Sequence, residues 1–265
     1  MRKFFSYFSI ALSDAFVYKA AGFIWMLNDI GPAIVGLIFW KAAFNSSVNI
    51  GGYTLQSMIF YYLGIMLVNT LVATHPQYDL SDQIRSGNFS KYLTKPINIT
   101  TSKIAGSIAW RVIRFIYLLP VILLINIYLY KSNQGFSYLN LNIIFLTLSL
   151  IMAFLLNFFI KMSLGLATFW FTEAGWLFFT YRIINTFLSG ELIPLDLFPQ
   201  SVFNLISYLP FKYMLFFPLS IALNKQSYLN TVQGLLIQLF WCLVFYLIYK
   251  LVLKKGIKVY EAYGN

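Results

Sequence analysis

The segment LNIIFLTLSLIMAFLLNFFIKMSLGLATFWF, residues Leu141–Phe171, decides the fold of this chain. It contains a single charged residue, Lys161, and is otherwise almost entirely apolar. About 20 consecutive apolar residues are enough for a helix to cross the hydrocarbon core of a bilayer. A helix is suited to that environment because it pairs its backbone polar groups internally. The segment therefore predicts a membrane-spanning helix.

The composition of the whole chain indicates the same class. Of the 265 residues, 60% are hydrophobic and 10% are charged, and the mean hydropathy is +0.73. Soluble domains carry about 25% charged residues. The net charge is +11, but the basic residues gather near the ends of apolar runs, which favours contact with anionic lipid over nucleic-acid binding. We expect one all-α integral membrane domain, residues 1–265, that contacts membrane lipids and no nucleic acid.

Apolar runs of sufficient length predict six transmembrane helices. They lie near Ala20–Ala43, Met58–Thr74, Ile104–Tyr130, Leu141–Phe171, Gly175–Leu188 and Val232–Leu253.

The first 19 residues form an amphipathic pattern of their own. Phe4, Phe8 and Ala11 fall on one helical face, and Arg2 lies with several serines on the other. This pattern is typical of a helix that lies in the membrane interface. A cleaved signal peptide is the alternative, although Asp14 and the lack of a clear cleavage site count against it.

Basic residues near the runs orient the predicted spans, because cytoplasmic loops carry an excess of lysine and arginine. With six spans, one side holds Arg2, Lys3, Lys19, Arg85, Lys91, Lys95, Lys103, Lys250, Lys254, Lys255 and Lys258. The other side holds only Lys41, Lys131, Lys212 and Lys225. Both termini and the loop 75–103 are therefore expected in the cytoplasm.

Residues 186–222 are apolar but contain Gly190, Pro194, Pro199, Pro210 and Pro218. Each proline lacks a backbone donor and disfavours continuation of a helix. We expect two short helices that enter the outer leaflet and return, which is a re-entrant hairpin. A plain amphipathic external loop is the alternative.

The polar stretch DLSDQIRSGNFSKYLTKPI, Asp79–Ile97, interrupts the apolar pattern. Asp79 is a good N-cap residue, and Gly87 can end the helix that it starts. Leu80 and Ile84 are four residues apart and share one face. The stretch predicts a short, capped, amphipathic helix in the cytoplasmic loop.

The same stretch resembles the first cytoplasmic loop of permease subunits of type-2 ABC exporters, in which an acidic residue and a short helix precede I..G and L..P. The segments GGYTLQSMIFYYLG, GLATFWFTEAG, LSGELIPLDLFP and KKGIKVYEAYGN also resemble that family in order and spacing. The ending YGN departs from the two glycines expected there.

The resemblance implies a six-helix permease of the bacterial cytoplasmic membrane that forms a substrate pathway as a dimer. It makes the short helix a coupling helix, and we expect Asp79, Leu80, Asp82, Ile84, Arg85 and Glu173 to dock a separate ABC ATPase. The partner permease is either a second copy or a sister chain. Asp29 and Arg182 lie within predicted spans and are candidates for the pathway. Arg111 and Arg114 are expected to reach headgroups or Glu173.

The chain contains no G-x-x-x-x-G-K-[ST] phosphate loop. ATP and Mg²⁺ are therefore expected on the partner ATPase, with no cofactor in this chain. A membrane enzyme is disfavoured by the single histidine and the lack of HExxH and GxSxG motifs. A channel or secondary transporter that works without an ATPase stays an alternative. The transported substrate is left open.

Overall fold

The computed structural model describes residues 2–45, 49–131, 142–171 and 173–260. Within these ranges the regular structure is helical, with one isolated bridge between Ile50 and Tyr53. The α-helices are α1 (Arg2–Val17), α2 (Lys19–Ala43), α3 (Leu55–Val72), α4 (Pro76–Arg85), α5 (Lys91–Thr94), α6 (Ile99–Lys131), α7 (Asn142–Leu166), α8 (Gly175–Leu188), α9 (Gln200–Ser207), α10 (Phe216–Ala222) and α11 (Tyr228–Val259). Short 3₁₀ helices are η1 (Asn88–Ser90), η2 (Ala167–Phe169), η3 (Leu195–Leu197) and η4 (Phe211–Tyr213). The all-α prediction is confirmed.

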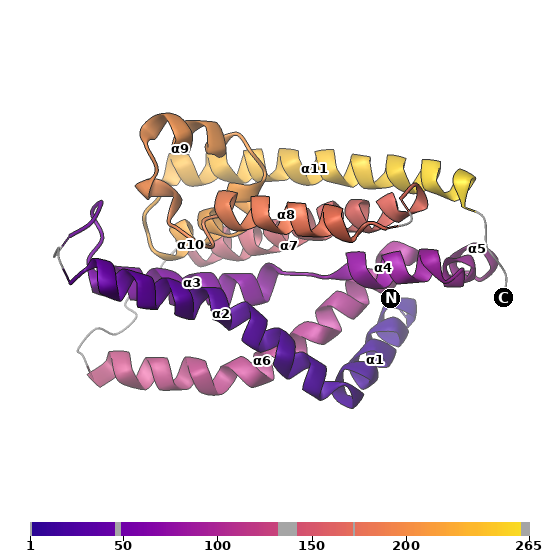
Figure 1. Cartoon of the computed structure of the whole chain (residues 1–265), viewed down its shortest axis with the longest axis horizontal. Helices are drawn as coiled ribbons and strands as arrows, with labels where there is room; N and C mark the ends of the chain where they lie inside the picture. Colours follow the sequence, from indigo (N-terminus) through magenta and orange to yellow (C-terminus); the bar gives the residue numbers. More distant parts are fainter. Residues whose placement is uncertain (1, 46–48, 132–141, 172, 261–265) are drawn as a thin grey trace.

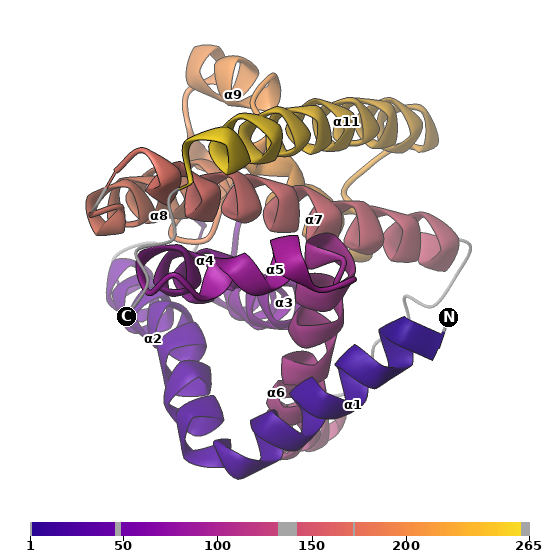
Figure 2. The ribbon, with the colours of Figure 1, turned by 90° about the vertical axis from the view of Figure 1, so that its right-hand side faces the viewer.

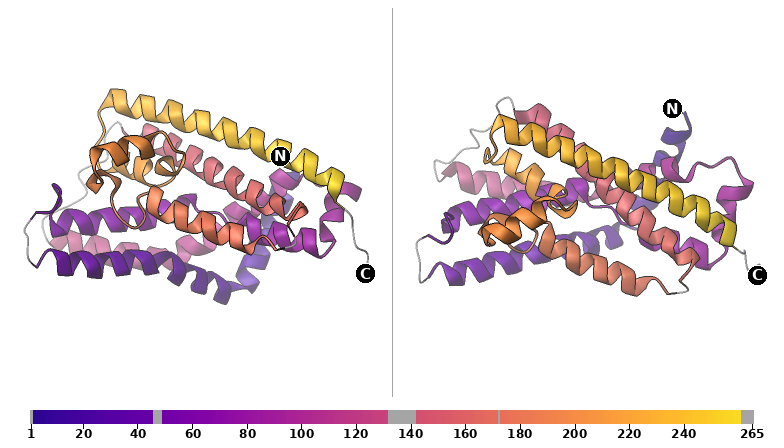
Figure 3. Two further views of the ribbon diagram at one scale, coloured as in Figure 1. Left: turned by 45° about the horizontal axis from the view of Figure 1, so that its top comes forward. Right: turned by 90° about the horizontal axis from the view of Figure 1, so that it is seen from above.

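The helices α7 and α11 run side by side along the bundle (Figure 1 and Figure 3). Three further helices, α3, α4 and α10, also pack on α7. The helix α7 is apolar on nearly every face, so several neighbours can cover it at once. The helix α6 packs instead against α1 and α2, and α2 packs against α3.

The two ends of the bundle differ in what they contain (Figure 1). One end carries α4, α5, the start of α1 and the C-terminal end of α11. The opposite end carries α9, α10 and the loop that joins α2 to α3. The polar loop and the proline-rich segment of the sequence therefore lie at opposite ends of one helical body.

Three helical segments in the described residues are long and apolar enough to cross a membrane. They are Leu55–Arg85, Ile143–Phe169 and Tyr228–Val259, and Ile34–Ala43 is a shorter apolar helix. These segments match the second, fourth and sixth predicted spans. The fifth predicted span is the helix α8, which has only 14 residues.

The helix α1 occupies the predicted interface segment and lies across α6 (Figure 2). It leaves Phe5, Ile10, Phe16 and Val17 exposed. A helix that keeps large apolar residues at its surface and begins with basic ones suits the boundary between headgroups and acyl chains.

The segment between α8 and α11 contains two short helices, α9 and α10, as its prolines predict. Pro199 and Pro210 each stand immediately before a helix, where a missing backbone N–H is tolerated. The helix α10 is buried along most of its length, with Phe216, Phe217 and Leu219 in the main apolar core. The α10 part of this segment is thus packed into the bundle, whereas α9 is largely exposed.

Candidate functional site

The helix α4 begins three residues before the predicted cap. His75 is the N-cap residue and Pro76 opens the helix, a position where proline is favoured because its N–H would be unpaired in any case. Asp79 therefore lies in the first turn and is not the cap, which corrects the prediction. The negative Asp79 near the start and Arg85 in the last turn both complement the helix dipole.

Asp79 fixes α4 to the N-terminal part of α6. Gln83 Nε2 donates a hydrogen bond of 2.6 Å to Asp79 Oδ1, and Lys103 Nζ forms an ion pair with Asp79 Oδ2. Lys103 also donates to Gln83 Oε1 at 3.2 Å. Burial, together with the charge of Asp79, raises the pKa of Tyr92 beside this cluster to about 12. The cluster joins side chains from α4, α5 and α6 and so holds the polar loop together.

The apolar face of α4 points into the chain. Leu80 and Ile84 are buried in a cluster with residues of α7 and α11, and Leu80 has no exposed surface. The docking role predicted for these two side chains needs correction, because a partner cannot reach them without moving α4. Their apolar stripe holds the helix in place.

Close packing of α4 on α7 depends on Gly165. A Cβ atom at Gly165 would lie 2.9 Å from Gln77 Cα and 3.2 Å from Leu80 Cβ. Thr168 Oγ1 forms a hydrogen bond of 3.0 Å with Ser81 Oγ just beyond this point. The two helix backbones therefore approach each other at a position where only glycine fits.

The outer face of α4 is polar and accessible. Asp82 and Arg85 are exposed, and Arg85 Nη2 lies 3.2 Å from Glu173 Oε1 in the turn before α8. The structure thus brings together three of the residues predicted for docking. A surface pair of this kind contributes little to stability, about 0–1 kcal/mol. Its charges are free to be exchanged for those of a partner.

The turn after α4 is fastened to the C-terminal end of α11. Gly87 follows the helix with φ of 75°, the left-handed conformation predicted for it at the helix end. Tyr260 Oη donates to the Gly87 carbonyl oxygen at 2.7 Å. The Tyr260 ring also packs on Phe89 and Phe169. The loop and the last span therefore meet at this end.

Two cations stabilise the break between α3 and α4. Arg111 Nε and Nη2 donate to the carbonyl oxygens of Leu71, Val72 and Ala73 at 2.7–3.1 Å. Lys161 Nζ donates to the Thr74 carbonyl oxygen at 2.6 Å. The last carbonyls of a helix lack partners within it, and positive groups bind them well.

These contacts change two sequence interpretations. Arg111 was expected to reach headgroups or Glu173, whereas it binds the end of α3, and Glu173 pairs with Arg85. The role of Lys161 was not predicted. The available signal was its position as the lone charge within Leu141–Phe171, since a charge inside a span usually has a specific partner.

The two predicted pathway residues differ in what can be said of them. Asp29 lies on α2, but its side chain is outside the part of the chain that the structure describes. Arg182 is exposed on α8. It lines a small cavity of about 50 Å³ together with Glu191, Asn157 and Asn185. The fold thus brings Arg182 and Glu191 to one cavity.

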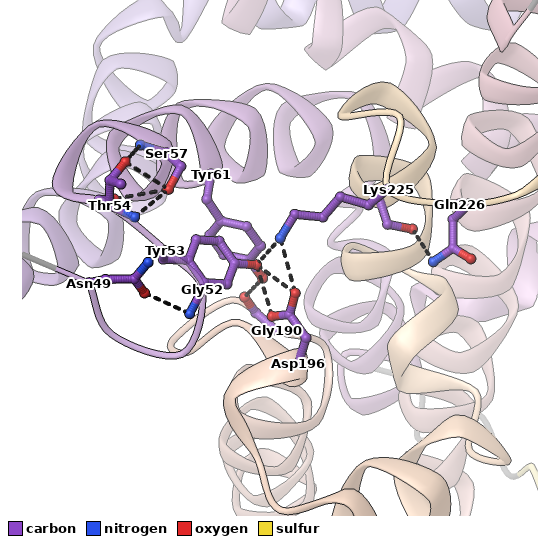
Figure 4. Close-up of polar contacts among 11 residues, drawn as sticks. Asn49, Gly52, Tyr53, Thr54, Ser57, Tyr61, Gly190, Asp196, Lys225 and Gln226 are labelled. Atoms are coloured by element: carbon purple, nitrogen blue, oxygen red, sulfur yellow. Dashed lines mark hydrogen bonds and ion pairs between the residues drawn. The ribbon is translucent and has the colours of Figure 1, made fainter.

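A polar cluster that the sequence did not predict lies at the opposite end of the bundle (Figure 4). Tyr53 Oη contacts both carboxylate oxygens of Asp196 at 2.8 Å, and Lys225 Nζ lies 3.0 Å from Asp196 Oδ2. Lys225 also contacts the Tyr53 hydroxyl and stands 3.8 Å from its ring centroid. Burial and then the Asp196 charge raise the pKa of Tyr53 above its ordinary value. The cluster joins three loops that are distant in sequence.

Tyr61 adds a hydrogen bond at the same end of the bundle. Its hydroxyl donates to the Gly190 carbonyl oxygen at 2.6 Å (Figure 4). Gly190 has φ of 83° and turns the chain out of α8. The proline-rich segment is therefore held to α3 by hydrogen bonds as well as by apolar packing.

The described residues provide no metal centre. In the ranges that the structure describes, no three or more histidine, cysteine or acidic side chains are grouped so that they could hold a metal ion.

Comparison with known proteins gives one match. The model of a family described as ABC-2 family transporter protein matches residues 30–264. No curated protein and no solved structure matches the chain.

Proposed function

Because the chain belongs to the ABC-2 family of transporter proteins, we propose that it is the membrane-spanning permease subunit of an ATP-driven exporter. Membership makes it a multi-pass membrane protein with a transport role and not itself an enzyme. Coupling to an ATPase, dimer formation and outward transport are parts of the proposal.

The observation that carries the proposal is the two-sided construction of α4. Its apolar face is buried against α7 and α11, while Asp82, Arg85 and the neighbouring Glu173 face outward. A partner that binds these exposed charges can move α4. The apolar face of α4, which is packed on α7 and α11, then transmits that movement to the spans. Interiors packed in this way transmit displacement because they resist compression.

ATP and Mg²⁺ are placed on a separate ABC ATPase in this proposal. The chain has no phosphate loop of its own. The ATPase would close on binding ATP and carry α4 with it, and the difference in its affinity for ATP between open and closed states would supply the energy.

We place six spans in the membrane: α2, α3, α6, α7, α8 and α11. The helix α1 then lies in the interface, and the segment 189–222 is a re-entrant hairpin on the outer side. The end with α4 and both termini faces the cytoplasm. This orientation is supported by the basic residues of the sequence, most of which belong to that end.

A second permease, identical or related, would cover the exposed face of α8. This helix exposes Trp176, Phe179 and Phe187, and Arg182 is exposed on it as well. A cation facing hydrocarbon is costly, so charged residues in spans face protein or water. A dimer that encloses this face gives Arg182 such surroundings and creates a pathway between the two copies. The membrane would be the cytoplasmic membrane of a bacterium.

The test is purification of the tagged chain from its native membranes in a mild detergent. We expect an ABC ATPase to accompany it and the complex to hydrolyse ATP in the presence of Mg²⁺. The double variant Asp82→Arg, Arg85→Glu should lose the ATPase. The variant Lys254→Glu, which changes an exposed charge on α11 and leaves α4 unaltered, should keep it. A wild-type chain that carries no ATPase and transports without ATP would overturn the proposal.

A further inference from the structure

A cavity of about 500 Å³ lies between α1, α6 and the loop that contains α4 and α5. It is at the end of the bundle that carries α4, α5 and the start of α1, where α1 crosses α6 (Figure 2). The coupling proposal uses the outer face of α4 and leaves this space unexplained. A cavity of this size can enclose the polar headgroup of a lipid or a similar anionic group.

Cations outnumber anions among the charged residues of the cavity. Its charged side chains are Lys91, Lys103, Arg111 and Arg114 on one hand and Asp14 and Asp79 on the other. The cations exceed the carboxylates by two, although Lys103 is paired with Asp79 and Arg111 donates to the carbonyl oxygens at the end of α3. Ser102, Ser107 and Gln83 add further hydrogen-bonding groups. An anion would thus meet a net positive charge in this space.

The position of Arg114 makes this charge effective. Its side chain is only 7% exposed, although it lines the cavity. A guanidinium presents several N–H groups in a planar fork that matches the oxygens of phosphate. Attraction between charges is much stronger where water is partly excluded than at an open surface.

The other wall of the cavity is apolar. It is formed by Ile10 and Ala11 of α1, with Tyr7 and Trp110 beside them. Ile10 is 63% exposed, so this wall continues onto the outer surface of α1. A ligand that is anionic at one end and apolar at the other fits such a lining better than a wholly polar solute.

We propose that this cavity binds the phosphate-bearing headgroup of an amphiphile, with its apolar chain lying along α1. The proposal rests on the proposed function only in placing α1 at the membrane interface. The shared chemistry is a phosphate group, which can belong to a membrane lipid or to a phosphorylated solute.

The test uses the full chain, purified alone in a neutral detergent, so that its outcome is independent of any ATPase. Thermal unfolding is followed while phosphatidylglycerol, phosphatidylcholine or inorganic phosphate is added. We expect phosphatidylglycerol to raise Tm in a saturable manner and phosphatidylcholine to raise it much less. Stabilisation by inorganic phosphate alone would assign the site to a phosphorylated solute in place of a lipid.

Two variants change the cavity in different ways. Lys91→Gln removes a partly buried charge and should weaken phosphatidylglycerol binding on the order of tenfold. Gly106→Leu adds bulk, because a Cβ at Gly106 would meet only Ala11 Cβ, at 4.0 Å, and the side chain can grow into the cavity. It should abolish binding while all charges stay in place.

Lys254→Gln is the matched control, since it removes an exposed charge on α11 outside the cavity. Wild-type affinity for phosphatidylglycerol in Lys254→Gln, with losses in both cavity variants, supports the site. An equal loss in all three variants, or equal stabilisation by the two lipids, would show only general surface attraction and overturn the proposal. If the site binds but no ATPase accompanies the chain, the proposed function fails and this inference stands.

Discussion

Lys161 Nζ of α7 donates a hydrogen bond of 2.6 Å to the carbonyl oxygen of Thr74, at the break between α3 and α4. Both residues are buried. The pair gives a reason for the one cation in a long apolar run, because the Thr74 carbonyl lies in the break just after α3, outside the hydrogen bonding of that helix. It also connects α7 to the break that leads into α4, the helix proposed to receive movement from an ATPase.

Replacing Lys161 with Met keeps the length of the side chain but removes its donor. We expect the variant to lose about 1–3 kcal/mol of stability, since a buried acceptor is left without its partner. The measurement is thermal unfolding of the purified chain in detergent. Lys258→Met, an exposed position on α11, serves as the control and should be close to wild type. Equal Tm values for Lys161→Met and wild type would contradict the interpretation.

Gly165→Ala tests the close packing of α4 on α7. The added methyl would lie 2.9 Å from Gln77 Cα, so one helix must shift, and we expect a loss of about 1–3 kcal/mol. Gly175→Ala is matched to it, because a Cβ there meets nothing within 4 Å. The measurement is the Tm of each variant, and we expect a lower Tm for Gly165→Ala than for Gly175→Ala. The argument fails if Gly165→Ala is as stable as Gly175→Ala.

Arg85→Glu should separate coupling from folding. The variant places a like charge beside Glu173, but an exposed ion pair contributes at most about 1 kcal/mol, so the fold should survive. ATP hydrolysis by the complex with its ATPase should fall strongly, while membrane insertion and Tm stay near wild type. Normal ATP hydrolysis in this variant would exclude Arg85 from docking.

Ile84→Glu should behave differently from Arg85→Glu, although the two residues are adjacent in the sequence. Ile84 is buried among residues of α7 and α11, so the substitution places an unpaired carboxylate in an apolar cluster. We expect poor folding, detected as aggregation in size-exclusion chromatography. If the Ile84→Glu chain folds normally but fails to bind the ATPase, Ile84 faces the partner and our placement of α4 is wrong.

Asp196→Asn tests the polar cluster at the end of the bundle opposite α4. The loss of charge weakens the contacts with Lys225 and Tyr53, and partial exposure of the ion pair limits the effect to about 1 kcal/mol. We expect faster cleavage by trypsin at Lys212 and Lys225, since the loops that carry them are held less firmly. Tyr53→Phe removes the hydroxyl alone and should give a smaller change in the same direction. Cleavage at the wild-type rate in both variants would show that the cluster does not hold these loops.

The sequence predicted the helices best where the signal was local. The prolines of residues 186–222 indicated two short helices, and α9 and α10 are found there, with Pro218 in the first turn of α10. Gly87 was correctly placed at the end of a helix, because its left-handed conformation follows from the residue type. The start of α4 was misplaced because Asp79 resembles a cap, whereas Pro76 provides an earlier and equally good beginning.

The candidate site was less predictable. Leu80 and Ile84 were correctly assigned to one face, but periodicity cannot tell whether an apolar face meets its own chain or a partner. Tyr53, Asp196 and Lys225 were missed because they are up to 172 residues apart in sequence. Nothing in their local surroundings indicates that they meet.

The sequence alone determined that this chain is a helical membrane protein with a charged helix between two apolar runs. Those properties depend on local hydropathy, on charge and on the residues that begin and end helices, all of which act over a short stretch of sequence. Only the tertiary structure decided that α4 presents Asp82 and Arg85 outward, that Lys161 binds Thr74, and that a cationic cavity lies under α1. Such features depend on which helices pack together, and that follows from the shape and pairing of the whole bundle.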